Sequence, residues 1–290
     1  MTERILVTGA TGTVGAEVLE ELRRMGAPVV AAVRDVQRAQ RTLGDQIAYA
    51  TFDFAKPETY GPALTGVRKL FLMRPPAIGD ARQLSPLIAA ARRAGVEHVV
   101  FLSLLGVEHN RVVPHYGIEQ DLLASGMDWT FLRASFFMQN LSTTHRDDIR
   151  DGDVIFVPAG DGRTSFIDAR DIGAVGALAL TDDRHRNQAY PLTGDTALTY
   201  GEVAELLSQA LNRPIRYPRP SIPAFALRMR SRGLDWAFIL VMIGIYTTAR
   251  LGMAGGVTPD TAQLLGRAPI SVAQFARDYR SSWARPDAAP

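Results

Sequence analysis

The sequence predicts an α/β fold, in which a doubly wound parallel sheet with helices on both faces is followed by a smaller, partly discontinuous C-terminal part. Across the first half, short apolar runs alternate with segments of helical periodicity, and the near-continuous runs suit strands that are covered on both faces. After Arg133 this alternation weakens. A hydrophobic share of 47% fits a globular chain with a sizeable core.

The strands of the first half are expected at residues 4–8, 29–33, 47–52, 69–73, 98–103 and 129–132. Helices are expected between them at residues 14–25, 37–43, 57–64, 80–94 and 116–125. In the second half, strands at 154–156, 164–167 and 189–192 alternate with helices at 169–180 and 200–211. A loop is expected around Pro214, Pro218, Pro220 and Pro223, and a last helix at 271–283.

These elements predict two domains and a tail. Residues 1–150 form a nucleotide-binding domain, with returning segments near 164–194, and residues 151–285 form a smaller substrate-binding part. Residues 286–290 are expected to be a disordered tail. The apolar segment from Trp236 to Ala249 is shorter than the ~20 residues that span a bilayer, so it is interpreted as a buried helix or pocket lid, with interfacial membrane association as the alternative.

The glycine-rich turn between the first strand and the first helix carries the clearest chemistry. It reads Gly9-Ala-Thr-Gly12-Thr-Val-Gly15. The first glycine permits the tight turn, the second lets the backbone approach a phosphate, and the third lets the helix pack on the strand. The pyrophosphate of a dinucleotide would then bind at the helix N-terminus, which is the hallmark of a Rossmann-type domain.

The end of the second strand selects the cofactor in such domains. Arg34 follows the strand directly and can pair a 2′-phosphate, so NADP(H) is favoured over NAD(H). The alternative is that Arg34 is solvated and Asp35 binds the ribose of NAD. Asp53, after the third strand, stands where such folds bind the adenine amino group, although a plain strand-end cap fits it nearly as well.

Several further stretches make the chain resemble the NmrA-like family of atypical short-chain dehydrogenase/reductases over residues 1–210. They are the spacing of the glycine turn, Val33-Arg34, Phe101-Leu-Ser-Leu-Leu-Gly106, Gly117-Ile-Glu119, Ser125-Gly-Met-Asp-Trp-Thr-Phe-Leu-Arg133, Phe137-Met-Gln-Asn140, Phe166-Ile-Asp168-Ala-Arg-Asp171-Ile and Leu192-Thr-Gly194. The family includes NAD(P)H-dependent quinone, azo-dye and triphenylmethane reductases, and also nucleotide-binding regulators with no known catalysis.

The resemblance implies a Ser–Tyr–Lys mechanism, and this chain departs from it. Ser103 and Tyr116 match the serine and the tyrosine, but Gln120 stands where the lysine belongs. Lys56 and Lys69 are the only lysines, and neither is placed to substitute. Without that lysine, alignment of the nicotinamide with an easily reduced acceptor has to carry the reaction. Tyr116 or the neighbouring His115 is then a candidate proton donor, with packing and simple solvation as the respective alternatives.

The expected site follows from these positions. The cofactor residues are Gly9, Thr11, Gly12, Thr13, Val14, Gly15, Arg34, Asp53, Phe54, Leu72, Met73, Arg74, Ser103, Gln120 and Phe136. The catalytic candidates are Tyr116, His115 and Ser103, and the substrate candidates are Tyr116, Phe136, Phe137 and Asn140. Each of the two phenylalanines could equally pack in the core. The spacing of Asp168 and Asp171 suits a helix N-cap and a salt bridge, so no metal is assigned.

The function expected is that of an NADP(H)-dependent oxidoreductase that passes hydride to a planar, quinone-like or conjugated acceptor. The alternative is a non-catalytic redox sensor that binds NADP(H) and acts through a protein partner. A net charge of +2 without clustered cations argues against a nucleic-acid partner. The absence of cysteine excludes disulfides and thiolate chemistry, and the N-terminus carries no signal-peptide pattern, so a cytoplasmic location is expected. No transmembrane segment is expected, and a monomer and a homodimer are both left open.

Overall fold

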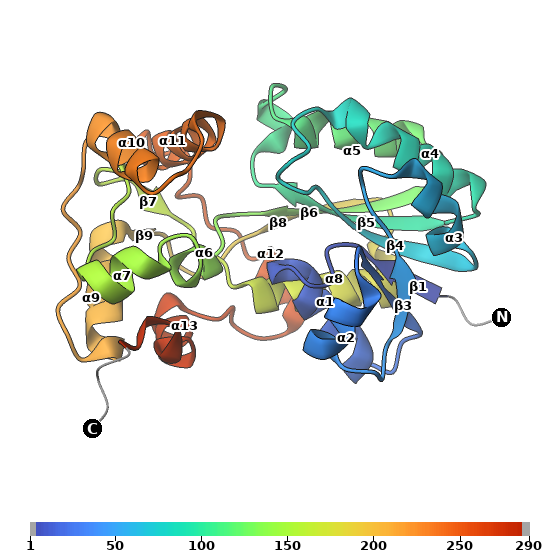
Figure 1. The fold of residues 1–290 in the computed structure, drawn as a ribbon, viewed down its shortest axis with the longest axis horizontal. Coiled ribbons are helices and arrows are strands. Elements are labelled where there is room, and N and C mark those ends of the chain that lie inside the picture. Colours follow the sequence, from blue (N-terminus) through green and yellow to red (C-terminus); the bar gives the residue numbers. More distant parts are fainter. Residues whose placement is uncertain (1–3, 286–290) are drawn as a thin grey trace. The chain divides into compact units, whose positions relative to one another are not determined.

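The computed structural model describes residues 4–285 and confirms the predicted Rossmann-type fold (Figure 1). A parallel sheet of seven strands runs in the order β3-β2-β1-β4-β5-β6-β8. Its strands are β1 (Arg4–Val7), β2 (Val29–Val33), β3 (Ala48–Thr51), β4 (Val67–Met73), β5 (His98–Leu104), β6 (Asp128–Ala134) and β8 (Gln188–Leu192). The expected tail, residues 286–290, lies outside the described residues.

The chain divides into two compact units. Unit 1 runs to Ala134 and resumes over Ala169–Leu192, and unit 2 comprises Ser135–Asp168 and the chain from Thr193 onward. Unit 1 therefore contains the whole parallel sheet, because β8 lies in the returning segment.

Helices cover both faces of the unit 1 sheet (Figure 1). One face carries α1 (Thr13–Arg24), α2 (Val36–Leu43) and α8 (Ala169–Thr181). The other carries α3 (Tyr60–Leu64), α4 (Ser85–Arg93) and α5 (Pro114–Ala124), and beneath these helices lies a core that includes Phe101 and Phe131. Strands β1, β2, β4, β5 and β6 are largely apolar, because helices cover both faces of this part of the sheet.

Glycines bring α8 close to α1. A Cβ built on Gly173 would lie 2.5 Å from Cβ of Glu17, and one on Gly176 would lie 3.0 Å from Val18 Cγ2. A larger side chain at either position would force the two helices apart. The returning helix is thus part of the layer that supports α1.

The strand order reverses between β1 and β4, the point where ligands of this fold bind at the carboxyl ends of the strands. Thr8 ties these two ends together. Its backbone N–H donates to the Phe71 carbonyl at 3.0 Å, and its hydroxyl donates to the same oxygen at 2.9 Å. Met73 N–H in turn donates to Thr8 Oγ1 at 3.1 Å.

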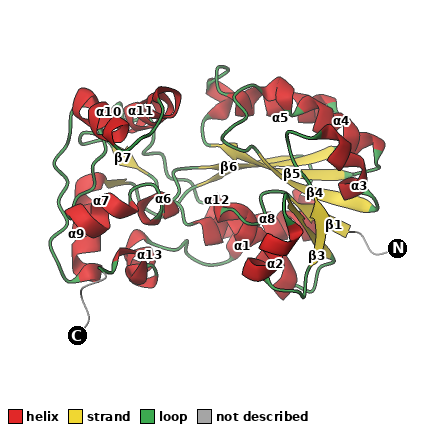
Figure 2. Cartoon of the chain, in the orientation of Figure 1, coloured by secondary structure: helices red, strands yellow, loops and turns green. Residues whose placement is uncertain are grey.

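Unit 2 is mostly helical (Figure 2). A short antiparallel pair, β7 (Arg163–Thr164) and β9 (Leu198–Thr199), accompanies the helices. The helices are α6 (Gln139–Ser142), α7 (Arg146–Gly152), α9 (Tyr200–Leu211), α10 (Ile222–Ser231), α11 (Trp236–Arg250), α12 (Asp260–Leu265) and α13 (Val272–Asp278).

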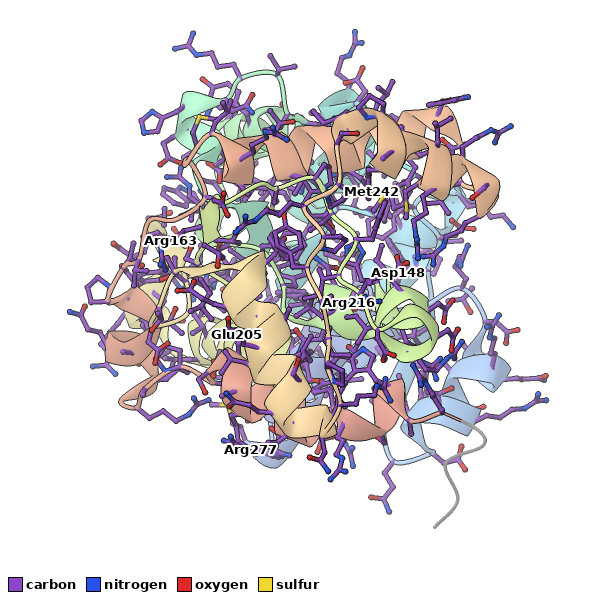
Figure 3. The ribbon with its side chains drawn as sticks, turned by 90° about the vertical axis from the view of Figure 1, so that its left-hand side faces the viewer. Asp148, Arg163, Glu205, Arg216, Met242 and Arg277 are labelled. Carbon is purple, nitrogen blue, oxygen red and sulfur yellow. The ribbon has the colours of Figure 1, made fainter. Side chains whose placement is uncertain are left out.

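Two interactions bind these helices together. In the core, Phe166 and Phe225 pack with Tyr200 and Tyr246. Asp148 of α7 is fully buried and accepts hydrogen bonds from two arginines that end or follow α10, Arg228 and Arg232. Figure 3 labels Asp148, together with Met242 on the side of α11 that faces the rest of the unit.

Two expectations for the second half were wrong, and a third is confirmed only in part. Residues 154–156 form no strand, only an isolated bridge between Val154 and Arg216. Pro223 lies inside α10 because it occupies the first turn, where proline loses no hydrogen bond, and Ser221 caps that helix. The segment from Trp236 to Ala249 is a helix, but only one of its faces is buried.

Each unit also buries an uncharged histidine. In unit 1, His98 is fully buried and its Nε2 lies 2.8 Å from Thr130 Oγ1; in unit 2, His145 is fully buried with its Nε2 against the Tyr246 hydroxyl. Burial lowers the pKa of each ring to about 4. Both rings are therefore neutral in the folded protein at pH 7.

Acid should destabilise the protein through these two rings. Unfolded histidine takes up a proton near pH 6.5, whereas the folded rings resist protonation down to about pH 4, so the free energy of unfolding falls as pH drops through this window. Each ring contributes a slope of about 1.4 kcal/mol per pH unit. Urea denaturation between pH 7 and pH 4 gives the number of protons that the chain takes up on unfolding. This number should be smaller by one in His98→Gln, whereas the exposed His109→Gln, the control, should not change it. An unchanged slope in His98→Gln would contradict this reading.

Candidate functional site

The glycine turn holds α1 hard against the end of β1. Gly9 adopts φ +64°, and its carbonyl accepts from Gly12 N–H at 2.8 Å. A Cβ on Gly15 would lie 2.2 Å from the Gly9 carbonyl oxygen and 2.9 Å from that of Thr8. A Cβ on Gly12 would lie 3.2 Å from the same Gly9 oxygen. Gly15 therefore meets a steric requirement that no other residue satisfies without a backbone shift, whereas Gly9 adopts a positive φ and Gly12 makes a close but less restrictive contact.

The N-terminus of α1 is open to an anion. In the described part of the chain, its N-cap Gly12 provides no side-chain cap, and the first turn holds no acidic residue. The first N–H groups of a helix lack intrahelical acceptors, and the helix dipole favours negative charge there. Thr11, Gly12 and Thr13 are exposed, while Val14 is buried and offers only its backbone. The turn thus fits the diphosphate of a dinucleotide.

At the end of β2, two neighbouring residues present opposite charges. Arg34 is exposed. Asp35 is the N-cap of α2, and its Oδ1 accepts from Arg38 N–H at 2.9 Å. The carboxylate thereby has a structural role, and the arginine side chain is the one left to meet a ligand at this strand end.

Four predicted cofactor residues lie at the ends of β3 and β4, and each has a different environment. Asp53 is half-buried, and its Oδ1 accepts from Ala55 N–H at 3.0 Å, which supports the strand-end cap. Phe54 packs edge-on against Phe52 at 4.8 Å. Met73 covers the turn, since its Cγ would lie 2.7 Å from a Cβ on Gly9. Leu72 is fully buried in the core, so it can offer a ligand only its backbone, and its part in cofactor binding stays a prediction.

Arg74 and His115 pair with each other, and this weighs against His115 as an acid. The guanidinium Nε lies 3.4 Å from His115 Nε2, and Nη1 contacts the Pro75 and Ile78 carbonyls. Burial, followed by the charge of Arg74, lowers the pKa of His115 to about 3. The ring is therefore neutral at pH 7, with Nε2 as an acceptor and only the buried Nδ1 left to carry the proton.

Tyr116 and Gln120 lie one turn apart on α5, on the same side of the helix. Tyr116 is half-buried, and the guanidinium carbon of Arg111 lies 5.8 Å from its ring centre. Gln120 is exposed. The helix thus presents a phenol and a neutral amide, where the related mechanism has a phenol and an ammonium group.

Ser103 is already engaged by the protein. It is 1% exposed, and its hydroxyl donates to Glu119 Oε1 at 2.6 Å. Glu119, itself buried, also accepts from Arg133 Nε at 3.2 Å and Nη2 at 2.8 Å. Hydrogen bonding to Glu119 raises the pKa of Arg133. The same guanidinium also pairs with Glu108 at 3.1 Å. The network joins β5, β6 and α5 and leaves Ser103 no free hydroxyl proton.

The three substrate candidates after β6 belong to unit 2. Phe136 is half-buried and packs edge-on against Phe166 and Tyr200, with ring centres at 5.6 and 6.3 Å. Phe137 forms an isolated bridge with Ile167, and Asn140 N–H donates to the Phe137 carbonyl. Phe136 is therefore part of an aromatic cluster, and the part that these residues play in binding stays a prediction.

Three residues that connect the site by hydrogen bonds were not among the predicted site residues. Thr8, Glu119 and Arg133 carry the hydrogen bonds that join the strand ends, yet each looked like an ordinary residue of its motif. An acidic residue five positions before the end of a helix, with an arginine on the strand that follows, is the signal that could have found the pair. Within residues 4–285, no group of three or more His, Asp or Glu side chains is arranged to hold a metal.

Comparisons with known proteins agree with this geometry. The model of the NmrA-like family matches residues 1–229. An NAD(P)H azoreductase from Xenophilus azovorans is 36% identical to this chain, and the match covers 96% of this chain and 99% of the azoreductase. Quinone oxidoreductase 2 of Escherichia coli is 30% identical over 79% of this chain and 82% of its own. The structure of an NADPH-dependent quinone oxidoreductase from Escherichia coli with NADPH superimposes with a TM-score of 0.85 at 27% identity, covering 94% and 99% of the two chains.

The buried Glu119–Arg133 pair should matter for stability. Glu119→Ala should lower the free energy of unfolding by about 1–3 kcal/mol, since it leaves the buried Ser103 hydroxyl without its acceptor and Arg133 with only the more exposed Glu108. The matched control is Glu108→Ala, which removes a more exposed partner of the same arginine and should cost about 0–1 kcal/mol. Urea denaturation measures both, and equal losses would contradict the prediction.

Proposed function

Since this chain belongs to the NmrA-like family and is an NAD(P)H-dependent reductase, we propose that NADP(H) is its cofactor and that a planar, quinone-like or conjugated molecule accepts the hydride. The open N-terminus of α1, held by Gly9, Gly12 and Gly15 at the reversal of strand order, carries this proposal. The names of the azoreductase and quinone oxidoreductase relatives support the class of acceptor. We place the reaction in the cytoplasm, because a chain without cysteine suits a reducing compartment.

The preference for NADP(H) rests on the β2 end. A 2′-phosphate carries two negative charges in excess of a hydroxyl and pairs well with a guanidinium. Arg34 is exposed there, whereas the Asp35 carboxylate, which would repel a phosphate, is engaged as the cap of α2. These two facts together favour the phosphorylated nucleotide.

Arg34→Ala should weaken NADPH binding about tenfold or more and NADH binding less than threefold, since a charge-assisted hydrogen bond of roughly 1.5–3 kcal/mol is lost only with the phosphate. Titration calorimetry with both nucleotides checks this. Arg38→Ala is the matched control, an exposed arginine one turn further along α2. Equal losses for NADPH and NADH in Arg34→Ala would overturn the cofactor assignment.

The chain's own contribution to the reaction is alignment and proton supply. When bound, NADPH supplies the hydride. A reduced quinone or azo group must also gain a proton, and the Tyr116 hydroxyl is the candidate donor on α5, directly or through water. Gln120 cannot stabilise a phenolate by charge, so Tyr116 serves an acceptor that is already reactive rather than an unactivated carbonyl.

Tyr116→Phe tests that role. If the hydroxyl donates the proton, the variant should keep its affinity for NADPH and lose about 10²-fold in kcat, with the loss concentrated at high pH, where water supplies protons poorly. Stopped-flow oxidation of bound NADPH gives the rate of the chemical step. Unchanged turnover would remove Tyr116 from the mechanism and leave alignment as the chain's whole contribution.

A second function is favoured by one observation, the neutral Gln120 in the place of the lysine. A redox sensor needs to bind NADP(H) without consuming it. Purified protein mixed with NADPH and a panel of quinones and azo dyes should oxidise the nucleotide with at least one acceptor. Tight NADPH binding without oxidation by any of them would contradict the reductase proposal for these acceptors and favour the sensor.

A further inference from the structure

Helix α11 has two apolar faces, and only one of them is covered. Ile239, Met242 and Tyr246 lie in the core of unit 2, and Figure 3 shows Met242 on this covered side. Five other apolar side chains of α11 are exposed to solvent. They are Trp236 (52% exposed), Phe238 (41%), Leu240 (63%), Val241 (58%) and Ile245 (45%), and we refer to these five residues as the α11 patch.

Neighbouring segments of the same unit extend the α11 patch. Helix α10 packs against α11, and its Leu227 is 68% exposed. Leu251 and Met253, which follow α11 directly, are each 67% exposed. Single exposed apolar residues are ordinary, but a run of them along one helix and its neighbours marks an interaction surface.

The stretch of chain that carries the α11 patch is strongly basic. Between Glu205 and Asp260 the chain holds one acidic residue, Asp235, whose side chain caps α11 by accepting from Phe238 N–H. The arginines of the same stretch are Arg213, Arg216, Arg219, Arg228, Arg230, Arg232 and Arg250.

Internal pairs neutralise this charge only in part. Arg228 and Arg232 share the single carboxylate of Asp148, so this cluster keeps a positive charge. Arg230 and Arg250 are exposed and pair with no carboxylate in the described part of the chain. The α11 patch is therefore flanked by cations at both ends, one group on and after α10 and one at the last residue of α11.

We propose that the α11 patch is a docking surface for an anionic lipid membrane. A helix with exposed Trp, Phe and Leu side chains beside arginines lies in the plane of the headgroups, with its apolar side chains among the acyl chains and its guanidinium groups against phosphates. The helix lies on the membrane and does not cross it, since no helix within residues 4–285 is long and apolar enough to span one. A second copy on the same patch is disfavoured, because a two-fold axis would bring the same cations together.

The test is co-sedimentation of the full chain with phosphatidylcholine vesicles, with and without phosphatidylglycerol. The protein should bind the anionic vesicles, and added salt should weaken the binding. Val241→Glu should lower the affinity about tenfold or more, since it removes apolar burial and adds a repelled charge. Arg230→Gln should lower it about fivefold, the equivalent of about 1 kcal/mol per arginine at a membrane surface. Val112→Glu, the same change at a 93% exposed residue of unit 1, is the matched control.

Three outcomes would overturn the proposal. The first is no binding to either kind of vesicle by protein that binds NADPH. The second is equal binding to neutral and anionic vesicles at all salt concentrations, which would remove the role of the arginines. The third is a lipid-free dimer, seen by analytical ultracentrifugation, that Val241→Glu dissociates, because the α11 patch would then be an interface between two copies of the chain.

Discussion

The close approach of α1 to the end of β1 is the contact on which the rest of unit 1 depends. A Cβ on Gly15 would overlap the Gly9 carbonyl, so the helix can start where it does only with hydrogen at that position. The same placement aims the first N–H groups of α1 at the reversal of strand order, between β1 and β4. Gly173 and Gly176 of α8 let that helix pack closely beside α1. One steric requirement thus sets both the packing and the anion-binding end of the helix.

A second constraint lies in the buried charge of Glu119. A carboxylate removed from water needs donors, and this one uses Arg133 and the hydroxyl of Ser103. The network braces α5 against β5 and β6, and its consequence is chemical. The serine that could have contacted a substrate is committed to the fold, and the lysine position holds Gln120, so of the usual catalytic set only Tyr116 keeps a partly exposed functional group.

The apolar side chains of unit 2 fall into two groups, one buried in an aromatic core and one exposed on α11. Tyr200, Tyr246 and Phe225 form an aromatic core with ring centres about 6 Å apart. On the uncovered side of α11, apolar side chains are exposed to solvent near Arg230 and Arg250, which pair with no carboxylate among the described residues. A helix that is apolar all round packs fully only when elements cover both faces, and in this unit one face has cover. That asymmetry is the physical basis for assigning the α11 patch to a lipid surface.

The sequence by itself determined most of unit 1. Strands and helices up to Arg133 follow from apolar periodicity, and the glycine turn follows from spacing, because both signals are local. Sequence patterns were less informative in unit 2, where packing partners determine the outcome. Pro223 lies within α10, residues 154–156 form a single bridge, and one face of α11 is uncovered. Only the tertiary structure decided which side chains pair across elements, such as Ser103 with Glu119 and His115 with Arg74. Periodicity tells which face of an element is apolar, whereas burial and pairing depend on elements that are distant in the chain.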